Sequence, residues 1–109
     1  MEVQPQEIRY YVTEEDVKPF IVWFNAFRNH TARNRIEIRL KRIELGNFGD
    51  CKFVGEGVYE LRVDTGPGYR VYFGRVDATI VLLLYGGDKS SQDRDILLAQ
   101  KYWSNYESN

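Results

Sequence analysis

The sequence predicts an α+β protein: an N-terminal strand, a two-helix hairpin, then a four-stranded antiparallel meander and a C-terminal helix. Three observations support this prediction. Apolar residues recur at helical spacing between residues 20 and 43, and from residue 50 onward they alternate with polar residues. Glycine-rich turns separate the alternating segments, as is typical of neighbouring antiparallel strands. At 109 residues, the chain is expected to form one domain over residues 1–109.

The composition is that of a folded protein in a reducing compartment. Charged residues make up 28% and aromatic residues 15% of the chain, a mixture that argues against disorder. The single cysteine, Cys51, cannot form an internal disulfide. Residues 1–5 lack the features of a signal peptide, and the longest apolar run, residues 80–85, is too short to cross a bilayer. We therefore expect a cytoplasmic protein with no membrane partner.

The first strand is expected at residues 8–12, which are rich in strand formers. Thr13 then resembles the N-cap of a helix over residues 14–27, with Pro19 near its first turn. The aromatic residues of this helix repeat at helical spacing and should face the core; they are Phe20, Trp23, Phe24 and Phe27.

A second helix is expected from its cap at Thr31 to about Leu45, where Gly46 stops it. One stripe of this helix is apolar, with Ile36, Leu40 and Ile43, and another is basic, with Arg35, Arg39 and Arg42. Residues 28–42 hold six basic residues against one acidic residue, a net charge of +5, whereas the whole chain carries −1. The basic stripe is either a solvent-facing surface or, at Arg39 and Arg42, a contact for RNA.

The meander begins with short strands at residues 51–54 and 58–64. In the second of these, Tyr59, Leu61 and Val63 point one way, while Glu60, Arg62 and Asp64 point the other. A hairpin turn at residues 66–68 leads to the next strand. There Tyr69, Val71 and Phe73 share one face, and Arg70 and Tyr72 share the opposite face.

The last strand, residues 80–84, has no alternation and should be a central strand covered on both faces. Ser90 or Ser91 then caps the final helix, which carries acidic residues in its first turn. Its apolar residues can dock on the sheet; they are Ile96, Leu97, Ala99 and Trp103.

The candidate chemistry lies on the polar face of the predicted hairpin, which carries Glu60, Arg62, Arg70 and Tyr72. A carboxylate, two guanidiniums and a phenol suit cleavage of an RNA phosphodiester, which needs a base, cations for the phosphorane charge and a proton donor. The alternative is that these residues form the solvated side of a half-buried sheet, with Glu60–Arg62 and Glu60–Arg70 ion pairs. Such faces are common in antiparallel sheets.

Residues 86–89, Gly-Gly-Asp-Lys, resemble a phosphate-cradling turn but lack the full spacing of a nucleotide-binding loop. A flexible turn here would either place Lys89 beside Arg70 or leave it as a solvated charge. His30, the single histidine, falls between the two predicted helices, and Cys51 has no histidine near it in sequence. We therefore expect neither a metal nor a small-molecule cofactor.

Together, residues 39–50, 57–62, 66–73 and 83–89 resemble the RelE/ParE toxin superfamily, and more narrowly its phage-derived, HigB-like addiction module killer proteins. The resemblance covers about residues 8–104. It implies a RelE-like fold and a type II toxin held inactive by a cognate antitoxin protein. It also implies metal-independent cleavage of mRNA on the ribosome.

Residue by residue, the resemblance implies that Arg70 contacts the scissile phosphate and that Lys89 is the basic residue after the last strand. Glu60 stands where a lysine is expected, so it is either the base or a structural partner. Tyr72 is a candidate proton donor, and Arg62 is expected to bind RNA. Two alternatives remain: a ParE-like inhibitor of DNA gyrase, and a catalytically silent protein that binds only its antitoxin and operator complex.

Overall fold

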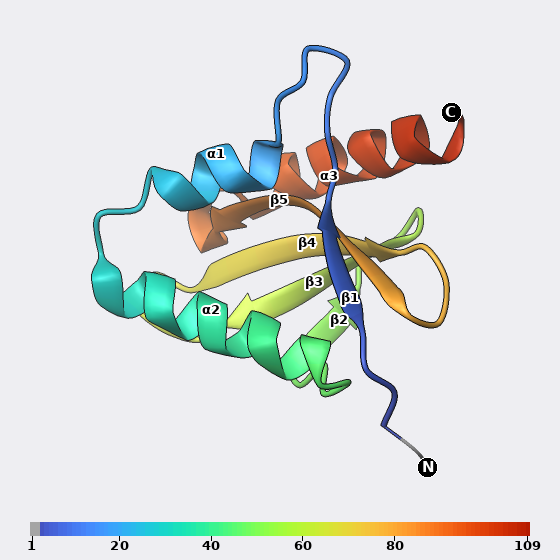
Figure 1. Ribbon diagram of the computed structural model, residues 1–109. Helices are drawn as coiled ribbons and strands as arrows, with labels where there is room; N and C mark the ends of the chain where they lie inside the picture. The colour runs from blue at the N-terminus through green and yellow to red at the C-terminus, as the bar shows by residue number, and fades with distance from the viewer. Residues whose placement is uncertain (1–2) are drawn as a thin grey trace.

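Five strands form one mixed sheet in the computed structural model, which describes residues 3–109 (Figure 1). The strands are β1 (Glu7–Tyr10), β2 (Cys51–Phe53), β3 (Val58–Val63), β4 (Tyr69–Arg75) and β5 (Ile80–Asp88). The helices are α1 (Pro19–Asn25), α2 (His30–Glu44) and α3 (Gln92–Glu107), with a short 3-10 turn, η1 (Lys89–Ser91), before α3. The α+β prediction and its element order are confirmed.

The sheet order is β1-β5-β4-β3-β2, so the last four strands form the expected antiparallel meander. β1 adds to the meander as a parallel partner of β5, with Ile8 opposite Val81. This pairing makes β5 a central strand. Its apolar run is buried on both faces, because Val81 and Leu83 point to one side and Leu82 and Leu84 to the other.

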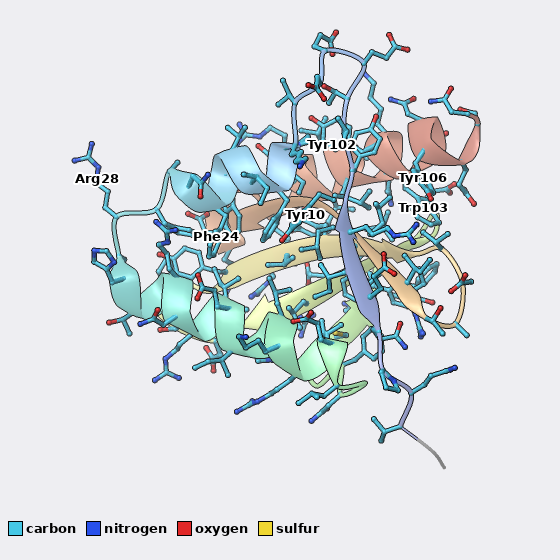
Figure 2. The ribbon with its side chains drawn as sticks, viewed as in Figure 1. Tyr10, Phe24, Arg28, Tyr102, Trp103 and Tyr106 are labelled. Carbon is cyan, nitrogen blue, oxygen red and sulfur yellow. The ribbon has the colours of Figure 1, made fainter. Side chains whose placement is uncertain are left out.

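Two separate apolar cores lie on the two faces of the sheet. Helices α1 and α2 cover one face, where Phe20, Ile36 and Ile43 pack on the inward residues of β3, β4 and β5. Helix α3 covers the other face with Ala99 and Trp103 (Figure 2). The prediction that Leu97 also docks is wrong, since its side chain is 67% exposed. Leu97 lies about 100° around the helix from Ile96, outside the stripe formed with Ala99 and Trp103.

Helix α1 begins at Pro19, so the prediction of a helix from residue 14 capped by Thr13 is wrong. The residue before a proline is driven out of the helical region, and Lys18 is extended, with φ −101° and ψ 97°. Thr13 instead closes a turn, because its hydroxyl accepts a hydrogen bond from the N–H of Val17 at 3.1 Å. The cap of α2 lies two residues before the predicted one, since Asn29, rather than Thr31, accepts a hydrogen bond from the N–H of Ala32.

Two glycines admit tryptophan rings to the sheet surface. A Cβ added to Gly74 would lie 2.2 Å from the ring of Trp103, and one added to Gly86 would lie 2.2 Å from the ring of Trp23. Gly86 therefore belongs to the interior of β5, which continues to Asp88. The prediction of a flexible phosphate-cradling turn at residues 86–89 is wrong because these glycines are used for close packing within a strand.

No helix within residues 3–109 is both long and apolar enough to cross a membrane.

Candidate functional site

Arg62 and Arg70 lie directly opposite each other on neighbouring strands. In the antiparallel register of β3 and β4, Arg62 pairs with Arg70, and two residues along Glu60 pairs with Tyr72. The prediction that these four side chains share one face is confirmed. Two like charges directly opposite each other destabilise a sheet unless a counter-ion lies between them.

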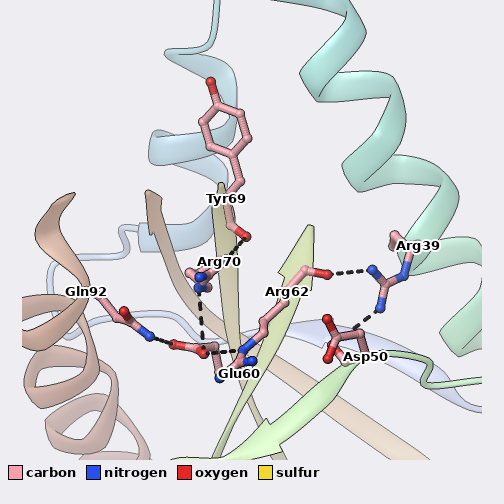
Figure 3. Close-up of polar contacts among 7 residues, drawn as sticks. All are labelled: Arg39, Asp50, Glu60, Arg62, Tyr69, Arg70 and Gln92. Carbon is pink, nitrogen blue, oxygen red and sulfur yellow. Dashed lines mark hydrogen bonds and ion pairs between the residues drawn. The ribbon is translucent and has the colours of Figure 1, made fainter. Parts of the chain in front are cut away.

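Glu60 is that counter-ion, and it is fully buried. Its Oε1 lies 3.2 Å from Nε of Arg62 and 3.7 Å from Nε of Arg70 (Figure 3). Its Oε2 accepts a hydrogen bond of 2.8 Å from Nε2 of Gln92, at the start of α3. The Glu60–Arg62 and Glu60–Arg70 ion pairs, which were expected if these residues have a purely structural role, are both present. The expectation that Glu60 faces solvent is wrong, because α3 closes over this part of the sheet.

The two arginines differ in how far they reach solvent. The side chain of Arg62 is 36% exposed and that of Arg70 is 13% exposed. Nη1 of Arg70 donates to the carbonyl oxygen of Tyr69 at 3.3 Å, whereas its buried Nε has no hydrogen-bond partner. Both guanidiniums therefore retain donor capacity while they share one negative charge.

Tyr72 lies beneath this cluster and does not reach the surface. Its hydroxyl is buried without a hydrogen-bond partner. Burial raises the pKa of Tyr72 well above its ordinary value, and the nearby carboxylates of Glu60 and Asp95 raise it further. The expectation that Tyr72 presents its phenol to a ligand on an open polar face is wrong.

Lys89 follows β5 directly and is exposed at the rim of the cluster. Its backbone N–H donates to the carbonyl oxygen of Gly68 at 2.9 Å, which fixes it against the turn between β3 and β4. Arg70 lies two residues beyond Gly68, and its cross-strand partner on β5 is Gly87. The structure thus places Lys89 next to Arg70 without the flexible turn that the sequence suggested.

Sequence reasoning missed two polar residues of α3. Gln92 contacts Glu60, and Asp95 is buried with a hydrogen bond of 2.5 Å from Oγ of Ser91. A Cβ on Gly87 would lie 1.9 Å from Oδ2 of Asp95, so the glycine leaves room for this carboxylate. Burial of Asp95 could have been predicted from its position one turn before Ala99, because the two residues lie on the same face of α3, the face that packs on the sheet.

The arginines of α2 do not join this cluster. Nη1 of Arg39 donates to the carbonyl oxygen of Arg62 at 2.5 Å, and its Nη2 lies 3.4 Å from the carbonyl oxygens of Phe48 and Asp50. The interpretation of the basic stripe as a solvent-facing surface is therefore wrong for Arg39, which ties α2 to the sheet edge. Arg42 remains exposed.

Cys51 is a poor candidate for a nucleophile. Burial raises the pKa of the Cys51 thiol to about 11, and its Sγ donates to the carbonyl oxygen of Phe48 at 3.2 Å. A thiol of this kind is a poor nucleophile near neutral pH. Across the described part of the chain, no group of three or more histidine, cysteine, aspartate or glutamate residues could hold a metal ion.

The cluster as a whole favours binding of an anion. Arg62, Arg70 and Lys89 contribute three positive charges to the cluster, and Glu60, which contacts both arginines, contributes one negative charge. Arginine binds phosphate oxygens through its planar fork, so a phosphodiester suits the exposed side of this group. Because Glu60 is buried among its partners, it orients the guanidiniums.

Comparison with known proteins places the chain in a family. No family model matches it. A search of curated proteins finds an uncharacterized protein of Haemophilus influenzae that is 49% identical over 86 residues, which covers 75% of this chain and 87% of that protein. Identity at this level over most of both chains shows common descent. The chain belongs to the same protein family as this Haemophilus influenzae protein.

Proposed function

We propose that this protein is the toxin of a type II toxin–antitoxin pair, and that it inhibits translation by cutting mRNA on the ribosome without a metal. The proposal begins from the resemblance of residues 39–50, 57–62, 66–73 and 83–89 to HigB-like members of the RelE/ParE superfamily. The fold supports it, since the order of elements is the one that the resemblance implies. In this proposal the partners are a cognate antitoxin, the ribosome and mRNA.

The observation that carries the proposal is the direct pairing of Arg62 with Arg70 around one buried carboxylate. Removing Glu60 from water costs several kcal/mol, which the pairing with Arg62 and Arg70 offsets only in part. An apolar residue at position 60 would avoid that cost. Such costly arrangements of charge are found preferentially at functional sites. A ligand with its own negative charge would complete the neutralisation of the two arginines.

The proposed reaction is attack of an RNA 2′-hydroxyl on the adjacent phosphorus. The new O2′–P bond closes a 2′,3′-cyclic phosphate as the P–O5′ bond breaks, and solvent water takes the proton from the 2′-hydroxyl and supplies one to the leaving 5′-oxygen. Arg70 and Arg62 bind the scissile phosphate and stabilise the charge that develops on its oxygens, and Lys89 adds a third cation at the rim. Glu60 and Gln92 are positioning residues that hold the guanidiniums in place. We assign proton transfer to neither Glu60 nor Tyr72, because both side chains are buried.

The proposal is tested by inducing the protein in bacterial cells and mapping mRNA 5′ ends, with plasmid supercoiling measured in the same cells. New 5′ ends at codon-linked positions, lost with Arg70→Ala, are the expected result. Relaxed plasmid with intact mRNA would contradict ribonuclease activity and indicate inhibition of gyrase.

A second candidate is a catalytically silent protein that binds its antitoxin alone. The specific observation in its favour is that Glu60 already contacts both arginines in the free chain. Incubating purified protein with programmed ribosomes and labelled mRNA separates the candidates. Cleavage supports the toxin, and intact mRNA together with tight binding of the neighbouring gene's product supports the silent protein.

A further inference from the structure

A groove of about 560 Å³ runs between helix α2 and the end of strand β3, on the opposite side of the sheet from α3. The residues that give it its chemical character are Arg35, Ile38, Arg39, Arg42, Val63 and Asp64. β2 begins opposite Leu61, and Asp50 just before it accepts a hydrogen bond from the N–H of Arg62 at 3.0 Å, so only the residues of β3 beyond Arg62 lie at an uncovered edge of the sheet. The groove is therefore open at this edge and can accept an extended or helical segment.

The groove is basic, with two charges free to bind a ligand. Arg39 forms part of its wall, and its guanidinium is held by the carbonyl oxygen of Arg62. Arg35 and Arg42 are exposed, and neither has an ion-pair partner within residues 3–109. With Asp64 as the acidic lining residue, three positive charges against one leave a net charge of +2. An occupant with carboxylates or phosphates complements this charge.

An apolar strip lies between the two free arginines. Ile38 follows Arg35 by three residues and precedes Arg42 by four, so the three side chains share one face of α2. The side chain of Ile38 is 49% exposed, whereas Val63 on the facing wall is only 2% exposed, so Ile38 supplies the accessible apolar surface. Burying Ile38 against a second apolar side chain would remove this exposed surface from water and stabilise a complex.

The lining distinguishes a protein occupant from a nucleic acid. Single-stranded RNA is usually held by aromatic rings that stack on its bases, and none of the lining residues is aromatic. An acidic amphipathic helix has what the groove needs: an aliphatic side chain for Ile38, flanked by carboxylates for Arg35 and Arg42.

We propose that this groove is a docking site for an acidic, amphipathic segment of a partner protein. An aliphatic side chain of the segment packs on Ile38, and its carboxylates pair with Arg35 and Arg42. The proposal goes beyond the proposed function, because it requires no cleavage of RNA and uses neither Arg62 nor Arg70.

The test titrates the ¹⁵N-labelled full chain with three probes. The first is a 16-residue helical peptide with leucine at every third or fourth position and glutamate between them. The second is the same peptide with serine in place of leucine, and the third is a twelve-nucleotide oligouridylate. We expect the leucine peptide to shift the amide signals of Ile38 and Val63, and the serine peptide to bind at least tenfold more weakly.

Charge reversal then locates the site. R35E/R42E should weaken binding of the leucine peptide at least tenfold, because two opposite charges become two like charges. The control K41E/K101E changes net charge equally with exposed residues outside the groove, and it should bind within about twofold of the unaltered chain. I38S, a change at a half-exposed position, should weaken the leucine peptide and leave the fold intact.

Three results would overturn the proposal. Oligouridylate could shift the groove signals while the leucine peptide does not, which would make this a nucleic-acid surface. The two peptides could bind equally, which would leave only non-specific charge attraction. In the third contrary result, neither the peptides nor the RNA shift the amide signals of the groove residues. None of these results bears on mRNA cleavage, so the two proposals fail separately.

Discussion

Gln92 donates a hydrogen bond of 2.8 Å to Oε2 of Glu60, and so ties the first residue of α3 to the buried carboxylate of β3. The other oxygen of that carboxylate lies within 3.7 Å of Nε of Arg70, and Arg62 is closer still. One side chain thus joins the last helix to both arginines. The stability and the charge of the candidate site both depend on it.

Glu60→Gln should lower the free energy of unfolding by about 2–3 kcal/mol, because it keeps the shape of the side chain but leaves two adjacent guanidiniums without a counter-ion. We place the loss at this size because Arg62 is partly exposed and therefore screened by solvent. Urea unfolding followed by circular dichroism measures the change. The matched control is Glu37→Gln, an exposed change on α2 that should have little effect. An unchanged free energy in Glu60→Gln would show that the carboxylate is not the bridging charge.

Arg70→Ala should lower mRNA cleavage about 10²–10³-fold, because it removes a cation that stabilises the developing phosphorane charge. Arg70→Lys should also be impaired, since lysine lacks the planar fork. Rates on programmed ribosomes measure the effect, and thermal unfolding checks the fold. Arg28→Ala is the control, because Arg28 extends from the loop between α1 and α2 away from the protein body (Figure 2). A fully active Arg70→Ala would remove Arg70 from the proposed reaction.

Leu83→Asp should unfold the protein, because Leu83 is fully buried in the core beneath α1 and α2. An unpaired charge there costs several kcal/mol, comparable with the whole stability of a domain. The same substitution at the 67% exposed Leu97 provides the control and should leave the melting temperature nearly unchanged. Equal melting temperatures for the two variants would contradict the placement of β5 in the interior.

Gly74→Ala should destabilise the fold by about 1–3 kcal/mol, because the new methyl group would overlap the ring of Trp103. Tryptophan fluorescence during urea unfolding reports the change. Adding Trp103→Leu should recover part of the loss caused by the alanine, measured against Trp103→Leu alone. If the two changes were instead additive, the close contact between Gly74 and Trp103 would not be the cause.

Cys51 should react slowly with iodoacetamide at pH 8. Burial raises its pKa to about 11, so its thiolate fraction is roughly 100-fold below that of the urea-unfolded chain. The stabilisation linked to the neutral thiol is complete below the unfolded pKa and is lost as pH rises through about 11. Alkylation followed by mass spectrometry at pH 8 and pH 10, with and without urea, measures both rates. Equal rates in the folded and unfolded chain would contradict burial of the thiol.

Local patterns predicted the elements and their faces well. The alternation in residues 58–64 and 69–73 assigned Leu61 and Val71 to one side of the sheet and Arg62 and Arg70 to the other, because side chains alternate strictly along a strand. The start of α1 was predicted wrongly because the helix was extended back from the aromatic residues to residue 14, past Pro19. A proline disfavours the helical conformation of the residue before it, so Lys18 is extended and the helix begins at Pro19. Gly86 was interpreted as a turn because a sequence does not show which bulky ring lies above a glycine.

The sequence by itself determined the order of strands and helices, the shared face of Arg62 and Arg70, and the central position of β5, since these follow from periodicities within a few residues. Only the tertiary structure decided that α3 covers Glu60 and Tyr72, that Gln92 completes the cluster, and that Arg39 binds backbone carbonyls. The contact of Arg39 with Arg62 joins residues that are 23 positions apart in the sequence, and that of Gln92 with Glu60 joins residues that are 32 positions apart. They depend on which polar groups need partners once helices close over the sheet, and no local pattern encodes that requirement.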